Sequence, residues 1–412
     1  MNTFSMVFLA ALALATAARL WLARRHVSHV RAHRDQVPVA FAQEIDLPSH
    51  QKAADYTCAK TRFAMIDLVV GVAVLLALTF GGGLQWLHAV SAAWLGEGIP
   101  RGLLLIALAG LLMMLADLPS DLYRTFVIEQ RFGFNKTTPV LFFVDLLKSL
   151  LVGALLLLPL VAMILWLIRE LDTLWWVCAW AVTALYGFFA QLIAPTIIAP
   201  LFNKFSPLQD PELKVRVERL LERCGFKVKG LLVMDGSRRS AHGNAYFTGF
   251  GASKRIVFFD TLLARLNPSE VEAVLAHELG HFKLRHIVKR LLLSSTLSFG
   301  FFWLLHVLME QAWFYNGLGV ASPSAAMALI LFMLALPPFT FLLQPLGALY
   351  SRKHEFEADQ YAVQNASARD LVSALIKLYR DNASTLTPDP LHSAFHDSHP
   401  PAVARIARLQ NT

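Results

Sequence analysis

The sequence predicts a mainly α-helical integral membrane protein with seven transmembrane helices and one small α+β domain outside the lipid. Of its 412 residues, 56% are hydrophobic and only 16% are charged, and the mean hydropathy is +0.50. Soluble domains carry about 25% charged residues, so this chain lacks the charge to cover a soluble surface. The apolar residues also gather in long uncharged runs, close to the ~20 residues that a helix needs to cross the hydrocarbon layer.

Seven runs have this character. We expect transmembrane helices at about 3–22, 64–86, 102–118, 149–168, 174–196, 291–310 and 325–348. The first run resembles a signal peptide, but its positive charges (Arg19, Arg24 and Arg25) follow the apolar stretch instead of preceding it, which indicates an uncleaved membrane helix. The third run is short, because only fifteen uncharged residues separate Arg101 from Asp117.

Basic residues indicate the orientation of these helices. Residues 19–62 carry eight Lys or Arg and residues 118–148 carry four, whereas 84–101, 169–173 and 310–325 carry one, one and none. Loops rich in Lys and Arg stay in the cytoplasm, so we expect the N-terminus outside and both long polar stretches inside. The chain then divides into 1–196 (helices one to five with their loops), 197–290 (a cytoplasmic insert), 291–350 (helices six and seven) and 351–412 (a C-terminal cytoplasmic segment).

The insert has the pattern of a small α+β unit. Apolar residues recur at helical spacing from Asp210 to Cys224, and two short β-rich runs follow, Leu231–Met234 and Arg255–Phe259. The net charge of +8 does not indicate a nucleic-acid partner, because many basic residues flank apolar runs instead of forming one stripe. The three cysteines (Cys58, Cys178 and Cys224) have no paired spacing, which argues against disulfides and against a thiolate metal site.

The strongest local signal is the H-E-x-x-H motif from His277 to His281. Asn267 and Glu270 have the spacing of a capping box and predict the start of a helix that contains it. Histidines four residues apart share one helix face and can bind one zinc ion, and Glu278 between them can act as general base. Chance alone would produce the motif in roughly one such chain in fifty, so a third ligand is needed to support it.

That third ligand must be distant in the sequence. The metzincin pattern would place it soon after the motif, but Leu284 and Ile287 stand at the corresponding positions. The segment Ser351–Asp359, just after the last apolar run, carries Glu355 and Asp359 four residues apart. One of them could bind the metal while the other supports a ligand histidine.

The alternative interpretation of the segment Ser351–Asp359 is an ordinary charged helix in contact with water. Glu357 lies on a different helix face from Glu355, which predicts that it points away from the metal. His286 and His354 are further possible ligands. A histidine in a polar flanking segment is more often exposed, however, and this is what we expect for both.

Taken together, the motifs resemble those of the type I CAAX prenyl proteases, which are seven-span zinc endopeptidases. The similarity extends from about Phe126 to Leu409, and several motifs occur in the right order. The segments that carry it are Phe126–Lys136, Asn244–Tyr246, Arg255–Leu262, His277–His281, Ser351–Asp359 and Ser398–Pro401. The resemblance implies a zincin-like catalytic domain that holds one zinc ion through His277, His281 and Glu355.

The resemblance also assigns roles that spacing does not. It implies that Glu278 is the catalytic glutamate, that Asp359 supports the ligands, and that His399 and Arg405 stabilise the oxyanion and shape the site. Asn244, Ala245 and Tyr246 match a strand whose edge pairs with an extended peptide substrate. The expected substrates are peptides or proteins, including prenylated or membrane-associated ones.

The chain departs from the eukaryotic pattern in its short termini and loops, in the absence of a C-terminal retrieval signal, and in having His354 where an aromatic residue is common. These departures favour a bacterial homologue in the inner membrane, with its site on the cytoplasmic side.

Other functions fit parts of the sequence. A quality-control protease for misfolded membrane proteins would use the same zinc chemistry on less specific substrates. An intramembrane-cleaving protease would place the motif within the lipid, which the charges flanking it at Glu270, Glu272, Lys283 and Arg285 disfavour. A transporter with a structural metal would carry ionisable residues in several membrane helices, whereas most of the apolar runs here are nearly free of charge.

Overall fold

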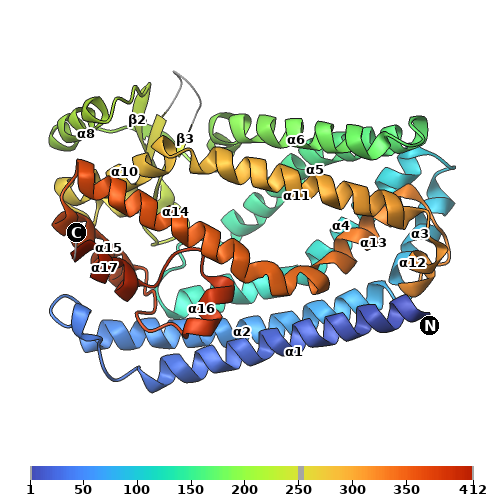
Figure 1. The fold of residues 1–412 in the computed structure, drawn as a ribbon, viewed down its shortest axis with the longest axis horizontal. Coiled ribbons are helices and arrows are strands. Elements are labelled where there is room, and N and C mark those ends of the chain that lie inside the picture. Colours follow the sequence, from blue (N-terminus) through green and yellow to red (C-terminus); the bar gives the residue numbers. More distant parts are fainter. Residues whose placement is uncertain (1, 249–254, 411–412) are drawn as a thin grey trace.

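The structure is a computed structural model that describes residues 2–248 and 255–410. Long helices run side by side along the longest axis of the molecule, with the N-terminus at one end (Figure 1). The strands and the short C-terminal helices gather at the opposite end, together with the C-terminus. The molecule therefore has a purely helical end and a mixed α+β end.

Seven helical stretches in the described residues are long and apolar enough to cross a membrane, which confirms the predicted fold class. They are Thr3–Ala32, Leu47–Leu78, Ile99–Glu129, Pro139–Glu170, Trp175–Phe202, His286–Met309 and Ala325–Asn365. The helices and short helical segments within and between these stretches are α1 (Thr3–Ala32), α2 (Leu47–Leu78), α3 (Gly83–Trp94), α4 (Ile99–Tyr123), α5 (Pro139–Glu170), α6 (Trp175–Ile193), α7 (Ala199–Phe202), α11 (His286–Met309), α12 (Ala312–Gly317), α13 (Ala325–Thr340) and α14 (Gln344–Asn365).

Two predicted spans have different ends in the structure. α2 ends at Leu78, not near residue 86, because a turn follows in which Gly82 has a left-handed backbone (φ 77°) that glycine adopts without strain. The third stretch continues past Asp117, through a π-helical turn (Arg124–Glu129), so its charged residues extend one end of a long helix. Its short apolar run therefore belongs to a helix of full membrane length.

The main apolar core of the helical part lies toward the N-terminal end. It joins side chains from α1, α3, α4, α12 and α13, among them Phe8, Leu84, Leu105, Phe314 and Leu331. Elsewhere on the membrane helices many large apolar side chains are exposed, for example Leu155 of α5 (75%) and Met333 of α13 (70%). Such exposure is expected where helices contact lipid in place of water.

Within the described residues, the α+β end contains a four-stranded sheet and six helices. The strands β1 (Phe205–Pro207), β2 (Gly230–Met234), β3 (Ala245–Thr248) and β4 (Arg255–Phe259) lie in the order β1-β2-β4-β3. β2 and β4 are parallel, and each pairs antiparallel with its outer neighbour. The helices are α8 (Pro211–Arg223), α9 (Asp260–Leu263), α10 (Pro268–Lys283), α15 (Ala368–Asp381), α16 (Pro390–His396) and α17 (Ala402–Gln410).

Helix α10 is at the centre of this end, in contact with α8, α14 and α15. Its apolar face, including Val271, Leu275 and Leu279, packs with Val217 of α8 and Phe258 of β4 in one buried cluster. The predicted helix and the two predicted strands of this domain are all present. Because α14 continues the last membrane stretch, it brings residues after position 350 alongside α10.

Candidate metal centre

The helix that carries the motif begins as its sequence predicts. Asn267 Oδ1 accepts a hydrogen bond from the Glu270 backbone N–H at 2.9 Å, and Glu270 Oε2 accepts one from the Asn267 N–H at 2.9 Å. Glu270 is buried, and Lys377 and Ser373 of α15 also donate to it. Burial opposes ionisation of this carboxyl group, but these bonds outweigh it and lower the pKa of Glu270. The start of α10 is thereby fixed to α15.

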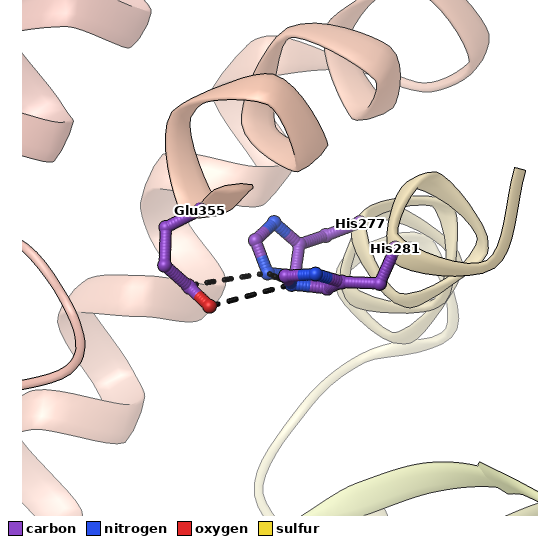
Figure 2. Close-up of side chains that lie close together, drawn as sticks. All are labelled: His277, His281 and Glu355. Atoms are coloured by element: carbon purple, nitrogen blue, oxygen red, sulfur yellow. Dashed lines mark hydrogen bonds and ion pairs between the residues drawn. The ribbon is translucent and has the colours of Figure 1, made fainter. Parts of the chain in front are cut away.

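One turn of α10 and one residue of α14 face each other at the candidate site. His277 and His281 project from α10 toward Glu355 of α14 (Figure 2). The two Nε2 atoms are 3.2 Å apart. His277 Nε2 lies 3.5 Å from Glu355 Oε2, and His281 Nε2 lies 3.3 Å from Glu355 Oε1. The structure thus brings together three residues that are up to 78 positions apart, counted as 355 minus 277.

These three side chains fit a tetrahedral metal ion. Ligands bound at 2.0–2.1 Å in a tetrahedron are separated by about 3.3 Å, which is close to all three observed distances. Because the carboxylate accepts only and an unprotonated Nε2 also accepts, such a cluster of acceptors needs a cation at its centre. His277 and Glu355 are buried, and His281 is partly exposed, which leaves an accessible side. A fourth position can therefore stay open.

A buried ion pair between Asp359 and Arg405 supports His277 through its Nδ1 atom. Its Nδ1 lies 2.8 Å from Asp359 Oδ1, one turn after Glu355 on α14. Arg405 of α17 donates to both Asp359 oxygens, at 2.9 and 2.5 Å, and is itself 6% exposed. Burial opposes charge on the ring, but the hydrogen bonds to Asp359 and Glu355 outweigh it and raise the pKa of His277 to about 9, so these carboxylates favour a cation, either a proton or a metal ion, at Nε2. With its Nδ1–H held by Asp359, His277 presents Nε2 to the site.

A glycine allows α10 and α14 to approach this closely. A Cβ added at Gly280, inside the motif, would lie 3.0 Å from the Cα and 3.1 Å from the carbonyl oxygen of Ala358. Both are backbone atoms that cannot move alone. Any larger residue at position 280 would therefore push α14, and Glu355 with it, away from the two histidines.

Comparisons with known proteins agree with this arrangement. A family model described as "CAAX prenyl protease N-terminal, five membrane helices" matches residues 26–204, and one described as "Peptidase family M48" matches residues 207–412. This chain belongs to peptidase family M48.

Relatives of this family align over most of the chain. CAAX prenyl protease 1 homolog of Arabidopsis thaliana is 36% identical over 90% of each chain, and CAAX prenyl protease 1 of Saccharomyces cerevisiae is 34% identical, covering 91% of this chain and 88% of its own length. The crystal structure of S. mikatae Ste24p has a TM-score of 0.93 at 32% identity, over 99% of both chains. The protein is thus a membrane metallopeptidase, as its sequence motifs indicate.

The other residues that the sequence predicts near the metal of this M48 peptidase differ in their burial and in their contacts with the three ligands. Glu278 is half-buried next to His277, and its carboxylate makes no hydrogen bond or ion pair within the described part of the chain. His399 is 62% exposed, and its Nδ1 is 2.7 Å from Glu355 Oε2. Arg405, expected to stabilise the oxyanion and shape the site, donates to Asp359, and its Nη1 lies 3.7 Å from Glu355 Oε2. Its position suits support of the ligands.

The strand expected to bind substrate is at the edge of the sheet. β3 contains Ala245 and Tyr246, follows the exposed Asn244, and pairs on one side with β4. A cavity of about 850 Å³ opens beside it, lined by Tyr246, Phe247, His281 and Gln191 of α6. This cavity connects the edge strand with one of the motif histidines.

Two histidines were misjudged from the sequence. His286 and His354, expected to be exposed, are 1% and 4% exposed, whereas Glu357 points away from the three candidate ligands, as expected, and contacts His286. The reason is the junction between α10 and α11, where Arg285 has a left-handed backbone (φ 56°) that turns the chain back toward α14. A non-glycine residue in that conformation has no reliable sequence signal.

Proposed function

We propose that this protein is a zinc endopeptidase of the CAAX prenyl protease type, which removes the C-terminal residues that follow a prenylated cysteine or hydrolyses similar substrates. The observation that carries the proposal is the convergence of His277, His281 and Glu355, at distances that suit one tetrahedral ion. Supporting it are relatives named CAAX prenyl protease 1 that align along nearly the whole chain.

One zinc ion held by these ligands supplies a Lewis acid that polarises the scissile carbonyl and lowers the pKa of a water molecule to roughly 7. Glu278 adjoins the ligand His277 and has no described ion-pair partner, so its carboxylate is available as a base. It takes a proton from the attacking water and delivers it to the leaving amine. His399, exposed beside Glu355, is placed to donate a hydrogen bond to the substrate oxygen that gains negative charge.

The substrate lies extended along β3. An edge strand binds a peptide through its backbone N–H and C=O groups, which requires little of the peptide sequence. The adjoining cavity is lined mainly by apolar groups, including Phe226, Phe247 and Phe282, and its volume suits a bulky apolar substituent near the scissile bond. Together the two features favour a peptide that carries a hydrophobic modification.

The site is assigned to the cytoplasmic side. The basic segments 19–62 and 118–148 lie at the same ends of the membrane helices as the α+β domain, and such segments stay in the cytoplasm.

The chain is divided by function into two parts. Residues 1–196 and 291–350 form the membrane part, and residues 197–290 and 351–412 form the catalytic part. Helix α14 crosses the last boundary without a break. No nucleic acid is involved.

Hydrolysis of a farnesylated CAAX peptide by the purified full-length protein tests the proposal. Activity should be lost with a chelator and restored by zinc. Glu278→Gln should keep one zinc per chain and lower kcat by at least ~10²–10⁴-fold, because general acid–base catalysis contributes about that much. Retained hydrolysis in this variant would overturn the assignment of the base.

Two controls make the result specific. Glu272→Gln introduces the same change on the same helix, at a carboxylate that pairs with Arg223 at 3.1 Å outside the site, and should leave hydrolysis unchanged. A denatured membrane protein offered in place of the peptide tests the quality-control alternative, which the undemanding backbone pairing of β3 would permit. Preferential cleavage of that substrate would replace the proposed specificity.

A further inference from the structure

A second polar cluster, made of His286, His354 and Glu357, lies directly behind the candidate metal ligand His281. His281 Nδ1 is 3.0 Å from His286 Nδ1, and His286 Nε2 is 2.9 Å from Glu357 Oε2. His286 is the first residue of α11, and Glu357 follows the ligand Glu355 by two positions on α14. The line from His281 to Glu357 thus connects three helices behind the site.

The protons in this line can be assigned from chemistry alone. An ionised carboxylate only accepts, so His286 carries its proton on Nε2 and donates it to Glu357. A neutral imidazole then accepts through its other nitrogen, and His286 Nδ1 must receive its bond from His281 Nδ1–H. This leaves His281 Nε2, which faces His277 and Glu355, without a proton and free to bind a metal.

We propose that His286 and Glu357 are positioning residues that fix the tautomer and the ring orientation of His281. The inference rests on the proposed function, because it assumes that His281 binds zinc. Glu357 draws proton density along the chain of hydrogen bonds, which makes His281 Nε2 a stronger ligand. Neither residue touches the metal or the substrate.

The backbone between α10 and α11 makes this contact possible. In an uninterrupted helix, residues five apart point about 140° away from each other, so the side chains of residues 281 and 286 would diverge. Here α10 ends at Lys283, and Arg285 adopts a left-handed conformation before α11 begins. The turn brings His286 back to His281, with its ring 5.1 Å from the His281 ring.

His354 holds the plane of the His286 ring. The two imidazoles stack with centroids 4.0 Å apart and planes only 9° from parallel, and the edge of Tyr350 contacts His354 on α14. The three residues of the cluster have ligand atoms within 4.8 Å of one another, which also suits a second metal ion. Parallel stacked rings, however, direct their nitrogen lone pairs in parallel planes, so both cannot reach one ion without breaking the stack. The geometry therefore favours a hydrogen-bonded relay.

Zinc affinity tests the proposal independently of proteolysis. The full-length protein in detergent is stripped of metal and titrated with zinc against a chromophoric chelator. His286→Phe keeps a ring for stacking but leaves the His281 N–H without an acceptor, and should weaken zinc binding 10–100-fold. His286→Asn places an amide oxygen near the position of Nδ1 and should restore affinity to within a few-fold of wild type. A role in packing alone would give the opposite order, with Phe as the milder change.

His354→Phe is the matched control. It retains the stack and removes a nitrogen that a second metal site would need, so affinity and the stoichiometry of one zinc per chain should be unchanged. Two zinc ions in the wild type with one lost in His354→Phe, or an unaltered affinity in a folded His286→Phe protein, would overturn the relay. If His286→Phe does not fold, Glu357→Leu removes the acceptor of His286 Nε2–H at a residue whose side chain is 32% exposed, and unchanged affinity there would count against the relay equally. Failure of the proposed function would look different, since the wild type itself would then bind no zinc.

Discussion

The two histidines of the motif lie one turn apart on α10 but depend on different regions of the molecule. His277 contacts Asp359, which forms a buried ion pair with Arg405 of the C-terminal helix α17. His281 contacts His286, the first residue of membrane helix α11. His277 is therefore supported by the α+β end of the molecule, and His281 by the start of a membrane helix. The metal centre forms where these two regions meet, so its geometry reports on both.

The two supports also differ in their electrostatics. On the His277 side a full charge is buried, and removing Asp359 takes away the closest partner of the Arg405 guanidinium group. On the His281 side the connecting residue is a neutral imidazole, and breaking the line leaves one unpaired N–H, which costs about 1–3 kcal/mol. We therefore expect the His277 side to be the more sensitive of the two.

The largest effect should come from Asp359→Asn. The change removes the charged acceptor of His277 Nδ1–H and breaks the closest ion pair of buried Arg405, leaving only Glu355 at 3.7 Å, which costs about 3–5 kcal/mol of folding free energy. Zinc affinity should also fall, because the support of a ligand histidine is lost. Thermal unfolding and zinc titration measure the two effects. If Asp359→Asn proves milder than His286→Phe in both, the contrast between the two sides is wrong.

Gly280→Ala should damage both sides together. The added methyl group meets the Ala358 backbone at 3.0 Å, so α14 must shift, at a cost of about 1–3 kcal/mol, and carry Glu355 with it. Weaker zinc binding and a lower melting temperature are expected from the same two measurements. Gly300→Ala, on α11 where nothing lies within 4 Å of the new Cβ, should change neither. Equal behaviour of the two variants would show that helix separation does not control the site.

The smallest effect concerns acid stability at the start of α10, the helix that carries both histidines. The pKa of Glu270 is lowered in the folded protein, so the carboxylate contributes stability that is present above its unfolded pKa of about 4.5 and is lost as the pH falls through its folded value. Glu270→Gln should cost about 1–2 kcal/mol at neutral pH and less in acid. Chemical denaturation at pH 7 and pH 4 measures the difference. A cost that does not shrink in acid would mean that the loss comes from packing and not from charge.

Sequence reasoning worked where a signal is local or periodic. The capping box at Asn267, the shared face of His277 and His281, and the pairing of Glu355 with Asp359 at four-residue spacing all follow from helix geometry, and α10 and α14 do form there. The apolar runs likewise located all seven membrane helices within the described residues.

Sequence reasoning failed where the backbone departs from regular helix or strand geometry. The end of α2 depends on the turn at Gly82, and β1 contains only three residues, including Pro207, so neither produces a periodic pattern. The burial of His286 depends on one left-handed residue at Arg285, and that of His354 on stacking between two helices. The ion pair of Arg405 with Asp359 joins residues 46 positions apart and has no signature in the sequence.

X-ray absorption at the zinc edge of the purified full-length protein tests the central claim most directly. The arrangement of His277, His281 and Glu355 predicts one zinc per chain, with only nitrogen and oxygen neighbours at about 2.0–2.2 Å and the outer-shell scattering of two imidazole rings. A sulfur neighbour at about 2.3 Å, a shell with fewer than two imidazoles, or protein that holds no zinc after purification without chelator would contradict it.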